Sequence, residues 1–165
     1  MPQCSVKRIA LLSLLVLPCL SMAWSPQEIL AKRYKAFNDC ILKSDSKGMN
    51  AWLINNCAAN FTYTSYQKKT FKRDGFTAGV LDQFAKTNKV LKSETTIRTL
   101  DKKGTKIVAT VLTDFKGIVI FDTKKLTLTD LSVTQDTWVQ VGKDWKLQKM
   151  VQVNSDTQMH DEDGE

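Results

Sequence analysis

Histidine, proline and glycine are scarce in this chain of 165 residues, which contains one, three and seven of them. The only histidine, His160, lies near the C-terminus, so neither a histidine-rich metal site nor a cysteine–histidine catalytic pair has the residues it needs. The few glycines form no phosphate-binding loop and no nucleophile turn of a serine hydrolase. We therefore expect no metal and no cofactor.

Long apolar runs are also missing, with one exception near the N-terminus. Residues 9–20 are apolar, follow Lys7 and Arg8, and precede small residues that end at Ala23. This run of about 12 residues is shorter than the ~20 that a membrane-spanning helix needs. A secretory signal peptide over residues 1–23 is therefore favoured over a membrane anchor. The sequence predicts a secreted or periplasmic protein, cleaved near Ala23 and without a membrane span.

Charge is distributed unevenly, with 24 basic against 17 acidic residues and five of the acids among the last ten residues. We expect residues 24–155 to form one basic domain and residues 156–165 to be an acidic disordered tail. A basic surface can attract nucleic acid or an anionic ligand. The lysines are scattered along the whole chain, however, and no nucleic-acid-binding motif accompanies them, so no nucleic-acid partner is expected.

Cys40 and Cys57 are the only cysteines beyond the signal peptide. In an oxidising compartment two such thiols predict one disulfide bond. The bond would close a loop of about 17 residues and would stabilise the fold by about 3 kcal/mol in the chain-entropy description.

Three helices are expected in the first half of the domain. Ser25, Pro26 and Glu28 form a capping box with proline at the first helical position, and apolar residues at helical spacing continue to Leu42. A second helix is expected to end near Cys57. A third should run over residues 75–86 with Asp74 as its cap.

Strands dominate the rest of the chain. Alternating patterns predict strands over residues 61–65, 70–72, 90–100, 105–115 and 118–121, with a tight turn at Lys116 and Gly117. Residues 126–156 read as a long hairpin that turns at residues 142–144. Helices gathered on one face of a curved antiparallel sheet make an α+β fold, cone-shaped and open at one end.

The order of these elements, together with several short stretches, resembles the nuclear transport factor 2 (NTF2)-like superfamily. The stretches are residues 33–37, 61–64, 74–76 and 136–147, and the resemblance covers about residues 26–153. It is closest to the SnoaL-like members, including the family called domain of unknown function 4440. The resemblance implies a cone-shaped, cystatin-like roll with an interior pocket, and a homodimer formed through the sheet.

Some enzymes of this superfamily are ketosteroid isomerases, polyketide cyclases and dehydratases. In ketosteroid isomerases a tyrosine and a neutral aspartic acid hold an oxyanion while a second aspartate removes the proton. The resemblance places Tyr34 and Asp136 in the first two roles. The position of the base falls near Thr64, which cannot accept a proton near neutral pH. An enzyme would need another base, and Asp114 and Asp130 are the candidates, although neither lies at the family position.

The predicted pocket is lined by aromatic residues and the two polar candidates. These are Tyr34, Phe37, Trp52, Phe61, Tyr63, Asp136 and Trp138. Asp136 and Trp138 share one face of their strand, but the pattern leaves open whether that face points inward. The missing base favours a non-catalytic domain that binds a small apolar ligand or a protein partner. The alternative is an isomerase- or cyclase-like enzyme acting on a carbonyl compound.

Overall fold

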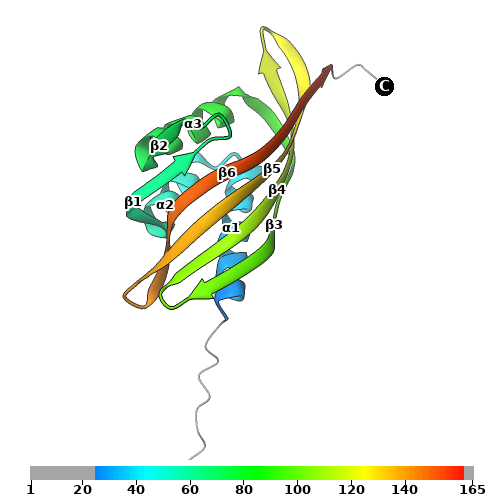
Figure 1. Cartoon of the computed structure of the whole chain (residues 1–165). Coiled ribbons are helices and arrows are strands. Elements are labelled where there is room, and N and C mark those ends of the chain that lie inside the picture. The colour runs from blue at the N-terminus through cyan, green and yellow to red at the C-terminus, as the bar shows by residue number, and fades with distance from the viewer. Residues whose placement is uncertain (1–24, 162–165) are drawn as a thin grey trace, which may run out of the picture.

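The computed structural model describes residues 25–161 and contains three helices and six strands (Figure 1). The helices are α1 (Pro26–Leu42), α2 (Ser46–Asn56) and α3 (Arg73–Lys86). The strands are β1 (Cys57–Thr64), β2 (Thr70–Lys72), β3 (Thr87–Lys103), β4 (Lys106–Phe121), β5 (Lys124–Val141) and β6 (Asp144–Asp161). None of the helices over residues 25–161 is long and apolar enough to cross a membrane.

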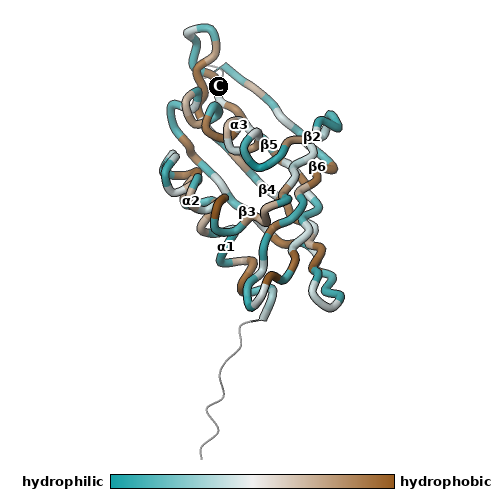
Figure 2. The backbone as a smooth tube through the Cα atoms, turned by 90° about the vertical axis from the view of Figure 1, so that its left-hand side faces the viewer, coloured by the Kyte–Doolittle hydropathy of each residue, from teal (hydrophilic) through white to brown (hydrophobic). Residues whose placement is uncertain are grey.

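One six-stranded sheet forms the framework, in the order β2-β1-β6-β5-β4-β3. All neighbouring strands are antiparallel except β1 and β6, which are parallel. The three helices lie on one face of the curved, unclosed sheet, as Figures 1 and 2 show. This arrangement confirms the expected α+β cone.

Side chains cap the N-termini of two of the three helices. Ser25 and Glu28 form the expected capping box of α1, and the Asp45 side chain accepts the Gly48 N–H at the start of α2. The expectation that Asp74 caps α3 is wrong. The capping position is Lys72, which makes no side-chain capping bond, and Asp74 lies inside the first turn with an almost fully exposed side chain.

The predicted turn at Lys116 and Gly117 does not form, and β4 passes through both residues. Gly117 is buried and pairs with Val90 on one side and Leu128 on the other. A Cβ atom there would lie 2.9 Å from the Phe115 ring and 3.2 Å from a backbone oxygen of β3. The glycine therefore permits close approach within the sheet, and the chain turns later, at Asp122 and Thr123, which both have positive φ.

β6 extends further than the sequence indicates. It pairs with β5 as far as Asp161, opposite Leu126, so residues 156–161 are strand and not the expected disordered tail. Asp130 of β5 accepts hydrogen bonds from the hydroxyls of Ser155 and Thr157, which adds side-chain support to the backbone pairing. The end of the predicted tail (162–165) and the predicted signal peptide (1–23) lie outside the described residues.

The core lies between the concave face of the sheet and helices α1 and α2. It contains Leu30, Tyr34, Met49, Trp52, Leu53, Cys57, Phe61, Ile107, Ala109, Val111, Trp138, Trp145 and Leu147. Helix α3 contributes no fully buried residue. Its partly buried Phe76, Val80 and Phe84 pack against the outside of this cluster, so α3 is the least embedded helix.

Cys40 and Cys57 are free thiols, so the predicted disulfide is not present. The Cys40 sulfur lies 3.2 Å from where a Cβ atom of Gly48 would be, near the first turn of α2. Cys57 follows the last turn of the same helix, about 13 Å further along at 1.5 Å per residue. A disulfide requires Cα atoms within about 7 Å, so these two cysteines, at opposite ends of α2, are too far apart to form one.

Candidate functional site

Tyr34, Asp136 and Trp138 form a buried chain of hydrogen bonds between α1 and β5. The Trp138 indole N–H donates to the Tyr34 hydroxyl at 3.1 Å, and that hydroxyl donates to Asp136 Oδ2 at 2.6 Å. The Tyr34 and Trp138 rings meet edge to face, with centroids 5.8 Å apart. The sequence pattern did not decide which way Asp136 and Trp138 point. Both point into the core, where the Tyr34 hydroxyl and the Asp136 carboxyl meet.

Burial controls the electrostatics of this chain. Asp136 is completely buried, and loss of hydration raises the pKa of its carboxyl to about 6, although the hydroxyls of Tyr34 and Thr134 act in the opposite direction. Burial and the nearby Asp136 carboxyl raise the pKa of Tyr34 well above its usual value. Within residues 25–161, Asp136 Oδ1 is buried without a hydrogen-bond partner. The site therefore keeps this carboxyl protonated to a higher pH than an exposed aspartic acid.

Within residues 25–161, none of the positions considered for the base lies beside this pair. Thr64, at the expected base position, shares a hydrogen bond with Thr70 at 3.0 Å. The odd-numbered residues of β4 from 107 to 111 are buried on the concave face, so the even-numbered Asp114 lies on the convex face. There it forms an ion pair with Lys92 at 2.7 Å. Asp130 shares the face of Asp136 but lies six residues away along β5, roughly 20 Å at 3.3 Å per residue.

The other residues expected to line a pocket pack against one another. Phe37 and Trp52 meet with ring centroids 4.9 Å apart, and the Trp52 indole donates to the Arg33 carbonyl. The rings of Phe61 and Tyr63 both pack against Phe76 of α3, with centroid distances of 5.6 and 4.8 Å. The seven residues thus belong to the core and its border.

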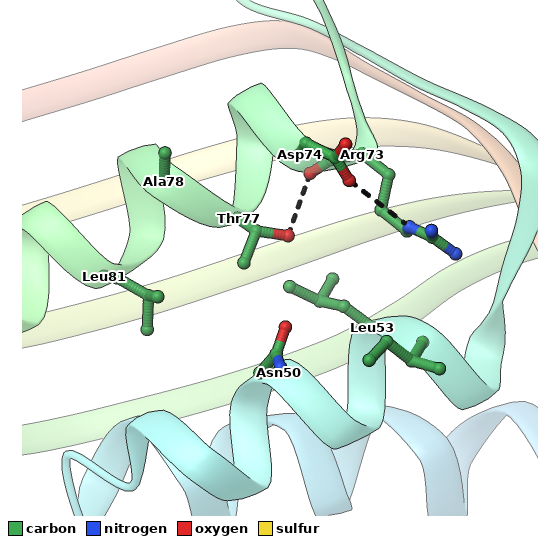
Figure 3. Close-up of a pocket in the computed structure, with 8 residues that line it drawn as sticks. Asn50, Leu53, Arg73, Asp74, Thr77, Ala78 and Leu81 are labelled. Atoms are coloured by element: carbon green, nitrogen blue, oxygen red, sulfur yellow. Dashed lines mark hydrogen bonds and ion pairs between the residues drawn. The ribbon is translucent and has the colours of Figure 1, made fainter.

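A first cleft lies between α2 and α3, outside the cone. Its volume is about 300 Å³, and its lining residues are Asn50, Leu53, Ile54, Arg73, Asp74, Thr77, Ala78 and Leu81. We call it the α2–α3 cleft; Figure 3 shows its labelled side chains. No sequence pattern predicts this cleft, because its lining residues come from two helices whose relative placement no local pattern encodes.

A second cleft, more polar, lies where the β1–β2 turn approaches β6. Its volume is about 410 Å³, and its lining residues are Ser65, Tyr66, Gln67, Gln152, Ser155 and Thr157. The Gln152 side chain already accepts bonds from the Tyr63 hydroxyl and the Tyr66 amide. Neither cleft includes any of the seven predicted pocket residues. In the described part of the chain, no group of three or more metal-ligating side chains is present.

Comparison with known proteins identifies the fold through structure alone. No protein-family model matches the sequence, and no curated protein matches it. Solved structures do match along most of their length. An NTF2-like protein from Cytophaga hutchinsonii has a TM-score of 0.55 and 12% identity, covering 78% of this chain and 98% of its own.

Two further structures give the same result. An NTF2-like protein of unknown function from Prochlorococcus has a TM-score of 0.56 and 13% identity, covering 81% of this chain and 95% of its own. A candidate dehydratase of the NTF2-like family from Streptomyces avermitilis has a TM-score of 0.57 and 13% identity, covering 76% of this chain and 93% of its own. At such identities the likeness concerns architecture and not chemistry. Three helices on a curved six-stranded sheet, matched over almost the full length of these structures, place this chain in the NTF2-like fold.

Proposed function

We propose that this protein is an exported, non-catalytic NTF2-like domain that binds a small apolar molecule. Export rests on the signal peptide predicted over residues 1–23. Binding rests on the NTF2-like fold and on the presence of a small cleft with aliphatic walls beside α3. The domain would act as a carrier or sensor of its ligand and would not convert it.

The observation that carries the non-catalytic assignment is the closed hydrogen-bond chain. A pair of donors stabilises an enolate only if both donors are directed at the position of the developing charge. Here the Tyr34 proton is directed at Asp136, at 2.6 Å, and the hydroxyl oxygen is occupied by the Trp138 indole. Tyr34, Asp136 and Trp138 are all buried, so a substrate carbonyl would have to displace packed side chains to reach them.

An isomerase- or dehydratase-like enzyme is the second candidate, because one observation favours it. The Tyr34 hydroxyl and the Asp136 carboxyl do converge, and the pKa of Asp136 is raised to about 6. Both features suit a pair that donates hydrogen bonds to an oxyanion. This candidate additionally needs an opening to the pair and a base, and neither Asp114 nor Asp130 lies beside it.

Titration with a phenol tests the two candidates directly. Phenols mimic an enolate and bind such donor pairs. We expect the wild-type protein to bind 4-nitrophenol no better than the Tyr34→Phe variant does, as measured by the absorbance of the bound phenolate. Tight binding that the Tyr34→Phe variant loses would overturn the non-catalytic assignment. A Tyr66→Phe variant, which changes an exposed tyrosine, is the control.

Export has its own test. Expression of the full chain in a host with a secretion pathway should release a product that begins at Trp24, as measured by N-terminal sequencing or intact mass. A product that keeps residues 1–23 and stays with the cells would contradict the proposed signal peptide.

A further inference from the structure

The α2–α3 cleft combines an aliphatic floor with a positive charge at one end. Leu53 is buried at 1% exposure and forms the floor, while Leu81 and Ala78 of α3 line the wall. Ile54 lies at the edge and is 54% exposed, although it is a large aliphatic residue. Figure 3 shows Leu81 and Ala78 at one end and the Arg73 side chain toward the other. A ligand with an apolar body would cover surface that water now contacts.

Arg73 has most of its hydrogen-bonding capacity left. Its only ion pair in the described part of the chain joins Nε to Asp74 Oδ1 at 3.8 Å, and the Asp74 side chain is 98% exposed. A guanidinium carries five N–H donors in a planar fork, which matches a carboxylate in a two-point contact. An exposed ion pair of this length contributes little, so an incoming anion competes with a weak partner.

The charge of Arg73 also acts on a core thiol. It lowers the pKa of Cys57, a core thiol whose pKa burial nevertheless raises to about 12. Thr77 lies between Arg73 and Leu81, and its hydroxyl donates a hydrogen bond to the Arg73 carbonyl at 2.8 Å. This bond stabilises the first turn of α3. The Asn50 side chain lies across the cleft on α2 (Figure 3).

We propose that the α2–α3 cleft binds a small amphipathic carboxylate, with its carboxylate on Arg73 and its hydrocarbon chain along Leu53, Ala78 and Leu81. The cleft volume, about 300 Å³, lies at the lower limit for small-molecule sites and suits one short chain. A doubly charged headgroup such as a phosphate monoester fits less well, because Asp74 adjoins Arg73, the one arginine among the lining residues of the cleft. This inference builds on the proposed binding function and names its ligand class.

Calorimetric titration of the mature wild-type protein with decanoate tests the proposal, with decanol as the uncharged probe. We expect decanoate to bind more tightly than decanol, and Arg73→Gln to weaken decanoate by about tenfold while leaving decanol unchanged. Leu81→Ala, which removes an apolar side chain that points toward α2 (Figure 3), should weaken both probes. Arg98→Gln, an exposed arginine on β3, is the matched control and should change neither.

Methyl NMR locates the binding without depending on any variant. Decanoate should shift the methyl resonances of Ile54, Leu53 and Leu81. Shifts confined to residues elsewhere, unchanged decanoate affinity in Arg73→Gln, or no binding by about 1 mM would each overturn the proposal. Binding of decanol in the cleft with no preference for decanoate would overturn the ligand class and leave the proposed binding function standing. The phenol titration tests the non-catalytic assignment independently.

Discussion

Asp136 is a buried residue whose protonation is coupled to folding. Its pKa is about 6 in the folded protein, against an ordinary 3.8. The folded state therefore holds this proton more tightly than the unfolded state does. The stability that it contributes is complete below about pH 4 and is lost as the pH rises to about 6, by roughly 3 kcal/mol at 1.36 kcal/mol per unit.

The Asp136→Asn variant removes this titration. We expect the free energy of unfolding of the wild type, relative to the variant, to fall between about pH 4 and pH 6 and then to level off. Urea unfolding at several pH values measures it. Other carboxyls, such as Asp144, titrate in both proteins and cancel in the difference. A difference that stays constant over this range would mean that Asp136 does not hold its proton as described.

Tyr34 joins the two other members of the buried chain, so removing its hydroxyl affects both. In Tyr34→Phe the Trp138 N–H and Asp136 Oδ2 would each lose a partner inside the core. We expect a loss of about 1–3 kcal/mol in the free energy of unfolding, as measured by urea titration at neutral pH. Tyr66→Phe, at an exposed position, should change it by less than about 0.5 kcal/mol. Equal effects of the two variants would contradict a structural role for the Tyr34 hydroxyl.

At the scale of single elements, α3 is the helix that the fold supports least. It has no side-chain cap and no fully buried residue, and Gly79 lies inside it with no atom within 4 Å of where a Cβ atom would be. Glycine in a helix interior is unfavourable relative to alanine. We expect Gly79→Ala to stabilise the protein by about 0.5–1 kcal/mol, as measured by thermal or urea unfolding.

Gly142 is the matched comparison for Gly79. It too has no atom within 4 Å of an added Cβ, but it sits in the β5–β6 turn with φ +63°. Alanine in this left-handed conformation is strained, so Gly142→Ala should destabilise the protein by about 1 kcal/mol. If both substitutions shift stability in the same direction, backbone conformation does not explain the difference.

At the scale of the whole molecule, the convex face of the sheet is the surface available for self-association. Leu131 lies on this face, opposite the strand face of Asp136, and is 44% exposed. The homodimer expected from the NTF2-like resemblance would cover it. Analytical ultracentrifugation of the mature protein should therefore show a dimer that Leu131→Glu weakens. Phe121→Glu, at the tip of the β4–β5 hairpin, is the control, and a wild-type monomer at high concentration would contradict the prediction.

Local signals predicted those features whose causes are local. The α1 boundaries, its capping box at Ser25 and Glu28, and the turn at Gly142 all depend on residues within a few positions of one another. Gly117 misled the prediction, because a glycine permits either a turn or a close approach between strands. Only the neighbouring Phe115 ring and the β3 backbone decide which.

The sequence by itself determined the α+β order, because periodicity survives in a linear chain, and the resemblance to the NTF2-like superfamily implied the fold and paired Tyr34 with Asp136. Tertiary structure alone decided that Asp136 faces inward, that Cys40 and Cys57 lie at opposite ends of α2, and that Arg73 borders a cleft. Each of these depends on distances between elements far apart in the chain. Such distances follow from packing, which no local pattern of residues specifies.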